Sequence, residues 1–285
     1  MANFSGGEAI GSGFRVITRN PAAIAVWAAF YLVVGLIPST LIQASVGSFS
    51  PNPNPADYQA VFARMTRLAA WLPVLWGLGL FYSALAYSAV YRAVLDPEDR
   101  RYFYLRLTRR ELYVGLTTFA LALLFVVGIV VEVVAVFVIA RAAPGLVTFL
   151  AICAAIAVTV WLALRFSMAP PMAYAQERFV LGESWGLTAG HGWKLFGVAF
   201  SLFVIVIGVE IVLLIPTAIV LSVTGAFSAM MATAQHAGGL TYPPAMIAAY
   251  LIVLPIFAAL MYTILIAPWA NIYGQLTGPK AGAAP

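Results

Sequence analysis

Six long apolar runs dominate this chain, and they constrain its fold more than any other feature. Lipid gives the backbone no hydrogen-bond partner, so only helices and closed barrels can span a membrane. Each run is about 20 residues or longer, the length an α-helix needs to cross a bilayer, and none shows the alternation typical of a barrel. The sequence therefore predicts an all-α polytopic membrane protein. The expected transmembrane helices cover residues 21–42, 68–90, 112–140, 145–166, 195–223 and 243–268.

The basic residues indicate how these spans are oriented. Only 9% of the chain is charged, and it holds 15 Lys and Arg residues. If the spans alternate, all of these fall on the side of the N-terminus except Arg64, Arg67 and Arg141. Cytoplasmic loops retain Lys and Arg, so both termini are predicted to be cytoplasmic. The net charge of +5 then indicates attraction to a membrane surface rather than to nucleic acid.

A weak threefold repeat relates the spans. Gly-Glu at positions 7–8 and at 182–183 opens two similar amphipathic segments, and Leu-Ile-Pro recurs at 36–38 and 214–216. The middle copy is weaker. The pattern predicts three helical hairpins, each preceded by a cytoplasmic amphipathic helix, in a single membrane domain over residues 1–285. The expected repeat units are 4–95, 96–176 and 177–276, followed by a flexible tail at 277–285.

The third amphipathic segment carries a resemblance to a known family. Its residues 183–188 read Glu-Ser-Trp-Gly-Leu-Thr, with Trp193 and Lys194 a few positions later, and the first segment ends in Arg-Asn-Pro at 19–21. The chain thereby resembles the membrane domain of some glycerophosphoryl diester phosphodiesterases and its free-standing six-helix bacterial relatives. The resemblance implies this fold and a place in the bacterial inner membrane. It implies no catalysis, because the phosphodiesterase barrel with its metal ligands has no counterpart here.

Two glutamates inside the apolar runs are candidate functional residues. Glu132 and Glu210 occupy equivalent positions in the repeat. A carboxylate within a membrane span is costly and usually faces the bundle interior or water. Both side chains are therefore expected to face the protein interior, where they either carry protons or hydrogen-bond a neighbouring helix.

An arginine-rich segment between the second and third spans is a candidate lipid site. An interfacial helix over residues 97–110 would combine aromatic surface with cations that can reach phosphates. The alternative is that the arginines only set the topology. The expected anionic-lipid contacts are Arg100, Arg101, Arg106, Arg109 and Arg110.

Glycines at helical spacing are candidate packing positions. Gly182-Glu183-Ser184-Trp185-Gly186 also fits the GxSxG pattern of a hydrolase nucleophile, but no strand precedes it, as that pattern requires. Close contact between helices is the better interpretation of these glycines. The expected packing glycines are Gly7, Gly11, Gly182, Gly186 and Gly190.

These features predict a non-catalytic inner-membrane protein that is a membrane-organising or lipid-associated accessory. Its expected partners are membrane lipids, anionic ones above all, and other membrane proteins, with no nucleic acid. No cofactor, metal ligands or catalytic residues are predicted. A small transporter or channel that uses the intramembrane glutamates is the main alternative, and an intramembrane enzyme is the third.

Overall fold

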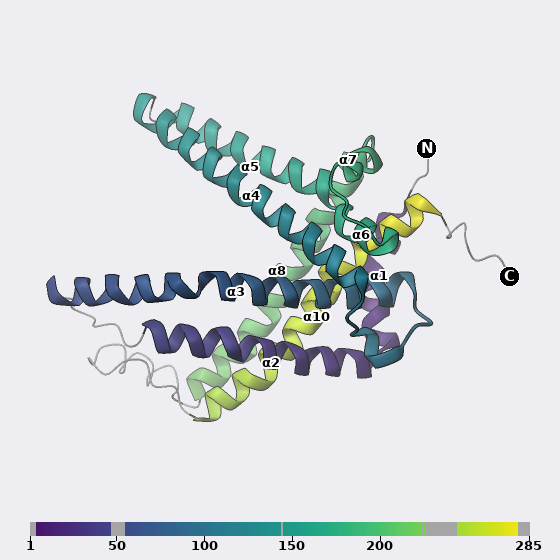
Figure 1. Ribbon diagram of the computed structural model, residues 1–285, viewed down its shortest axis with the longest axis horizontal. Helices are drawn as coiled ribbons and strands as arrows, with labels where there is room; N and C mark the ends of the chain where they lie inside the picture. The colour runs from purple at the N-terminus through teal and green to yellow at the C-terminus, as the bar shows by residue number, and fades with distance from the viewer. Residues whose placement is uncertain (1–3, 47–54, 144, 224, 226–243, 279–285) are drawn as a thin grey trace. The chain divides into compact units, whose positions relative to one another are not determined.

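The computed structural model describes residues 4–46, 55–143, 145–223, 225 and 244–278 (Figure 1). Within these ranges the structure is helical and holds no strand, which confirms the all-α prediction. The elements are α1 (Gly6–Arg19), α2 (Pro21–Val46), α3 (Pro55–Leu95), η1 (Arg101–Tyr104), α4 (Arg109–Ala142), α5 (Leu146–Phe166), α6 (Ala169–Gln176), α7 (Gly182–Thr188), α8 (Gly192–Val223) and α10 (Pro244–Thr277).

Five stretches of the described chain are long and apolar enough to cross a membrane, judged by length and composition. α1 and the described part of α2 pass the same test when taken together, so the number of spans is five or as many as six. The chain is therefore compatible with a polytopic membrane protein. The five stretches are Met65–Leu95, Arg101–Ala142, Leu146–Gln176, Gly192–Val212 and Leu251–Thr277.

The chain divides into two compact units. Unit 2 holds α2 and parts of α3, α8 and α10. Unit 1 holds α1, everything from η1 to α7 and the remaining parts of those three helices. Unit 1 comprises Met1–Arg19, Ser83–Leu202 and Thr263–Pro285, and unit 2 comprises Asn20–Tyr82 and Phe203–Tyr262.

In unit 1, α1 packs closely on the end of α10. The buried positions of α1 are Ala9, Ser12, Gly13 and Val16, the spacing of one helix face. A methyl group at Gly13 would lie 2.8 Å from the Ile264 Cα atom, so only glycine permits this approach. The predicted first amphipathic helix is thus present, and its apolar face contacts protein.

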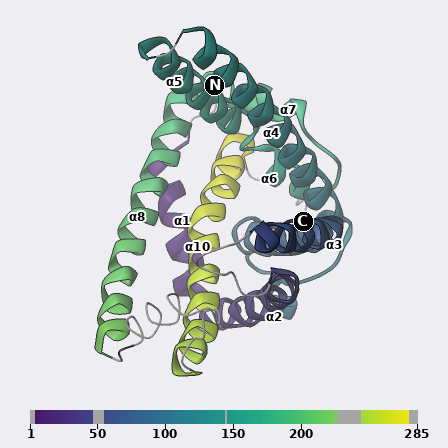
Figure 2. The same cartoon turned by 90° about the vertical axis from the view of Figure 1, so that its left-hand side faces the viewer.

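The α4–α5 hairpin forms the most exposed part of unit 1. The two helices lie side by side in both views, and α6 and α7 contact their base (Figures 1 and 2). Buried residues of α4 end at Leu121, and α5 has none. Large apolar side chains beyond that point, such as Val133 (61% exposed) and Phe137 (59% exposed), are uncovered. Such a surface needs a non-aqueous environment.

The predicted amphipathic helix over 97–110 is wrong. That segment is a loop with the four-residue turn η1, because Tyr102, Phe103 and Tyr104 have left-handed backbones, with φ of 51°, 55° and 68°. Left-handed residues cannot continue an α-helix. Short helices do precede the other two hairpins, namely α1 before α2 and α7 before α8.

Candidate functional site

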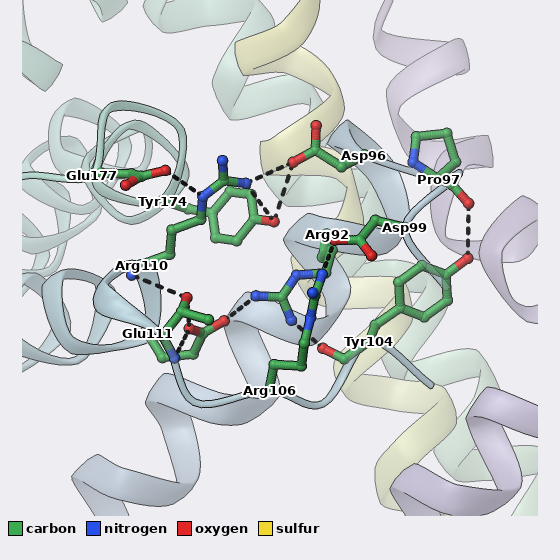
Figure 3. A network of polar contacts seen from close by, with 11 residues as sticks. Arg92, Asp96, Pro97, Asp99, Tyr104, Arg106, Arg110, Glu111, Tyr174 and Glu177 are labelled. Atoms are coloured by element: carbon green, nitrogen blue, oxygen red, sulfur yellow. Dashed lines mark hydrogen bonds and ion pairs between the residues drawn. The ribbon is translucent and has the colours of Figure 1, made fainter. Parts of the chain in front are cut away.

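A buried ion pair joins the end of α3 to the start of α4. Arg92 and Glu111 are each 2% exposed, and Arg92 Nη2 pairs with Glu111 Oε1 (Figure 3). Arg92 Nη1 donates to the Tyr104 carbonyl oxygen. Glu111 Oε2 accepts from the Thr108 backbone N at 2.7 Å and from the Thr108 hydroxyl, completing a capping box on α4. The buried charges are therefore satisfied by well-placed partners, as burial requires.

The left-handed turn η1 makes this arrangement possible. It buries Tyr104 (2% exposed), whose hydroxyl donates to the Pro97 carbonyl oxygen at 3.2 Å (Figure 3). The same turn directs Tyr102, 76% exposed, and Phe103, 45% exposed, outward. The loop thus holds one aromatic ring inside and presents two outside.

A second set of contacts ties this region to α6. Arg110 pairs with Asp96 at 2.9 Å and with Glu177 at 2.8 Å, and its guanidinium lies 5.1 Å from the Tyr174 ring centroid. The Tyr174 hydroxyl donates to Asp96 Oδ2 at 3.3 Å (Figure 3). Arg92 also lies 5.8 Å from the same ring centroid. We name the whole network the polar base: Arg92, Asp96, Tyr104, Arg110, Glu111, Tyr174 and Glu177.

The five predicted lipid-binding arginines divide into two groups. Arg106 pairs with Asp99, and Arg110 belongs to the polar base, so both are half-buried and neutralised. Arg100, Arg101 and Arg109 are exposed and form no ion pair within the described residues. We name residues 96–109 the arginine loop.

The two predicted intramembrane glutamates have different surroundings. Glu132 is half-buried and accepts a hydrogen bond from the Thr159 hydroxyl of α5 at 2.7 Å. Glu210 is exposed, contrary to the expected interior orientation. Glu132 belongs to unit 1 and Glu210 to unit 2.

Two apolar grooves on the α4–α5 hairpin share the Glu132–Thr159 pair. One, which we name the Trp185 groove, has a volume of about 290 Å³ and extends to Phe166 and to Trp185 of α7. The other has a volume of about 580 Å³ and extends to Phe137. Both lie on helices whose most apolar stretches have no residue buried inside the protein.

The predicted packing glycines do not make close contacts. A methyl group at Gly7, Gly182 or Gly186 would meet no atom within 4 Å, and one at Gly11 would meet only the flexible end of Arg15, because these glycines face away from neighbouring helices. Gly190 has a left-handed backbone, with φ of 79°, just beyond the end of α7. Its conformation is a physical reason for glycine there.

Ser184, the residue of the GxSxG pattern, has a structural contact. It is fully buried on α7, and its hydroxyl donates to the Arg165 carbonyl oxygen at 2.7 Å. The strand-to-helix turn of a nucleophile elbow is missing from this part of the structure. No group of three or more metal-ligating side chains occurs among the described residues.

Sequence reasoning missed the buried pair and a cluster of tyrosines. Thr108 and Glu111 have capping-box spacing immediately before an apolar run, and this signal could have identified Glu111. In unit 2, Tyr82 hydrogen-bonds Tyr31 and Tyr262, with ring centroids 5.2 Å and 6.1 Å away. These tyrosines come from three different helices, and no local pattern connects them.

Comparison with known protein families, with curated proteins and with solved structures gives no match for this chain. The resemblance to the membrane domain of glycerophosphoryl diester phosphodiesterases therefore stays a prediction. The geometry of unit 1 carries the functional argument instead. Its buried charges neutralise one another, and its outward surface offers cations, aromatic rings and apolar grooves.

Proposed function

We propose that this chain is a non-catalytic, lipid-associated accessory protein of the bacterial inner membrane, with both termini in the cytoplasm. Its arginine loop binds the anionic headgroups of the cytoplasmic leaflet. The proposal retains a repeat of three hairpins, in which the arginine loop takes the place of the middle amphipathic helix. A reporter fused after Asp99 should then report the cytoplasm, and an external signal there would refute the orientation.

One observation carries the proposal: arginines without an acidic partner and outward aromatic side chains lie on the same loop. Arg100, Arg101 and Arg109 are exposed without acidic partners in the described residues, beside the exposed rings of Tyr102 and Phe103. Arginine near a negatively charged leaflet contributes about 1 kcal/mol per residue. Aromatic rings favour the depth of the headgroups.

The polar base preorganises the arginine loop for binding. Tyr104 and Thr108, at two points of the loop, are bound to Arg92 and Glu111 inside. A loop held in this way loses little conformational freedom when it binds a headgroup. The buried pair therefore supports lipid binding without touching the lipid.

The test replaces the three exposed arginines by glutamine in the full-length protein. Native mass spectrometry in detergent would then measure binding of dioleoyl phosphatidylglycerol and of dioleoyl phosphatidylcholine. Three arginines at about 1 kcal/mol each predict a loss of roughly tenfold or more in phosphatidylglycerol affinity, with little change for phosphatidylcholine.

A matched control removes the same charge elsewhere. Arg15, Arg19 and Lys194 lie on the same predicted side of the membrane but outside the loop. Their triple glutamine variant should keep its phosphatidylglycerol preference. If both triple variants lose it equally, only total charge matters, and the proposal of a loop site fails.

A small transporter or channel is the second candidate, and Glu132 favours it. Its carboxyl group lies half-buried in an apolar groove, bonded to Thr159. Transport would require Glu132 to load and release a proton or cation. Exchange of Glu132 for Gln should then abolish uptake of that proton or cation into proteoliposomes, while phosphatidylglycerol binding at the arginine loop stays intact.

A further inference from the structure

The Trp185 groove is an apolar channel, and a cation packs against Trp185, the tryptophan that lines it. Its walls come from α4 and α5, including Phe125 and Leu162, and Trp185 of α7 lines it together with Phe166. Glu132 and Thr159 form its polar lining. Gly128 also lines it, and a methyl group there would meet no atom within 4 Å.

The cation is Arg165, in the last turn of α5. Its guanidinium carbon lies 5.4 Å from the Trp185 ring centroid and 5.6 Å from that of Trp161. Its Nη1 atom is buried and has no hydrogen-bond partner among the described residues. A guanidinium with unsatisfied donors is costly to bury, and a phosphate satisfies such donors in a matching geometry.

The part of the groove lined by Trp185 is held firmly in place. The hydroxyl groups of Ser184 and Thr188 donate to the Arg165 carbonyl oxygen at 2.7 Å and 3.2 Å, which fixes α7 on α5. The Trp185 ring meets that of Trp161 edge-on, with centroids 4.9 Å apart. Trp185 and the cation are therefore positioned together before any ligand binds.

An occupant must match an apolar groove between exposed helices and an arginine that packs against one of its lining residues, Trp185. The spans that carry α4 and α5 have none of their most apolar residues buried inside the protein, so the groove faces the hydrocarbon if these helices cross a membrane. A chain of methylene groups fits the walls, and a phosphate fits Arg165. A phospholipid carries both in one molecule.

We propose that the Trp185 groove holds one acyl chain of a phospholipid whose phosphate is bound by Arg165. The chain reaches the Glu132–Thr159 pair, the polar part of the lining. This site is separate from the arginine loop and does not depend on it, because no residue is shared. It places a bound lipid between the two helices of the least covered hairpin.

The test uses phosphatidylglycerol with a diazirine in one acyl chain and the full-length protein in proteoliposomes. After illumination, peptide mapping should find label on residues 124–132 of α4 and 159–166 of α5. Gly128→Leu fills the groove, and Arg165→Gln removes the cation while leaving the walls intact. Each should lower this labelling about tenfold, the loss expected for one charged hydrogen-bonding partner or for a blocked chain.

Matched controls separate the groove from general lipid contact. Gly208→Leu makes the same change at an open helical glycine outside the groove and should leave the labelling unchanged. A diazirine-labelled diacylglycerol without phosphate should label weakly, and an excess of inorganic phosphate should not compete. The glutamine variants of Arg100, Arg101 and Arg109 should label normally, so failure of the loop proposal would not imply failure here.

Each other outcome counts against the proposal. Unchanged labelling in both groove variants would overturn it, since the label would then report bulk lipid. Loss with Gly128→Leu alone would show a chain site without phosphate recognition, which overturns the role of Arg165. Crosslinks between two copies of the hairpin would identify a second copy of this chain as the occupant. Thermal unfolding in detergent checks that each variant is folded.

Discussion

The polar base and the outer part of the α4–α5 hairpin belong to the same unit, yet the base buries charged side chains while the hairpin exposes apolar ones. At the base, Arg92 and Glu111 are each 2% exposed and fully paired. In the hairpin, Val133 and Phe137 are more than half exposed, and a single hydrogen bond, from Thr159 to Glu132, is the described polar link between the helices. Ion pairs therefore hold the side chains of the polar base in position. The outer hairpin instead needs a non-aqueous environment around its exposed apolar side chains.

Breaking the buried pair should have the largest effect of any change considered. Arg92→Met leaves the Glu111 carboxylate buried without its cation, and removal of one partner of such a pair typically costs about 3–5 kcal/mol. We expect a large fall in the thermal unfolding temperature in detergent. The double variant Arg92→Met, Glu111→Leu should recover much of it, because no uncompensated charge remains.

A pair at the edge of the same loop provides the control. Arg106 and Asp99 are partly exposed, at 24% and 40%. Exposed ion pairs contribute about 0–1 kcal/mol, so Arg106→Met should change stability little. Equal losses from Arg92→Met and Arg106→Met would contradict the distinction between a buried base and an exposed rim.

The next largest difference in stability between regions is expected from helix packing. Gly13→Ala places a methyl group 2.8 Å from the Ile264 Cα atom, and overpacking of this kind costs about 1–3 kcal/mol. Gly128→Ala in the hairpin meets nothing within 4 Å and should stabilise by up to about 1 kcal/mol through helix propensity. Opposite shifts in unfolding temperature are expected, and shifts of the same sign would show that the hairpin is as closely packed as α1 and α10.

The difference between the polar base and the hairpin also explains which parts of the fold could be predicted from the sequence. The hairpin was predictable, because its runs at 112–140 and 145–166 are apolar without any contribution from tertiary contacts. α4 contains the first run, and α5 covers the second except for its first residue. The base was not, because Tyr104 becomes a partner of Arg92 only through three left-handed residues. No sequence pattern indicates left-handed backbone at Tyr102 or Phe103, where glycine or asparagine would be usual.

The partners of polar side chains were likewise not predictable from the sequence. Arg106 and Arg110 were expected to face lipid together with their neighbours, but acids distant in sequence, such as Glu177, neutralise Arg110. Conversely, Glu132 and Glu210 look equivalent in the sequence, but among the described residues a hydrogen bond to a neighbouring helix is found for Glu132 only. The sequence shows which side chains are charged. Which of them form ion pairs or hydrogen bonds depends on which helix turns come into contact in the fold.

The strained turn offers a finer test, in which stability and lipid binding should move in opposite directions. A left-handed non-glycine residue costs about 1–2 kcal/mol. Tyr102→Gly removes that strain at φ 51°, less the entropy cost of glycine, so a gain of about 1 kcal/mol in unfolding free energy is expected. Phosphatidylglycerol binding should weaken through loss of the exposed ring.

Leu107→Gly is the comparison for Tyr102. Leu107 is 72% exposed but lacks a left-handed backbone, so glycine there should not stabilise the protein. Denaturation in detergent would measure both variants. If Tyr102→Gly proves no more stable than Leu107→Gly, the turn is not strained and the base holds it at no cost.

A smaller effect is expected from the single polar link of the hairpin. Thr159→Val keeps the side-chain shape and removes the hydroxyl that donates to Glu132. Hydrogen bonds between membrane helices contribute about 0.6 kcal/mol on average, so the unfolding temperature should fall only slightly. A loss as large as that from Arg92→Met would mean that the hairpin, like the base, is held by polar contacts.

The smallest effect concerns an ion pair outside both regions. Arg178, in the segment that joins α6 to α7, donates from Nη1 to Oε1 of Glu183 in the first turn of α7 at 2.7 Å, and the two side chains are 52% and 48% exposed. The hydrogen bond from Arg178 lowers the pKa of Glu183 below its ordinary value of 4.5. Stability from this pair is therefore present above that value and is lost as the pH falls through the folded-state pKa.

The pH dependence of this pair can be isolated with one variant. Between about pH 6 and pH 3, the unfolding temperature of the native chain should fall slightly more than that of Glu183→Gln, which has no carboxylate to protonate. Solvent and salt screen such an exposed pair, so 1 M NaCl should remove most of the difference, since the screening length there is only about 3 Å. A difference that survives high salt would place the pair in a low-dielectric environment. The segment between α6 and α7 would then be buried like the base, by membrane or by a partner, rather than lying in water.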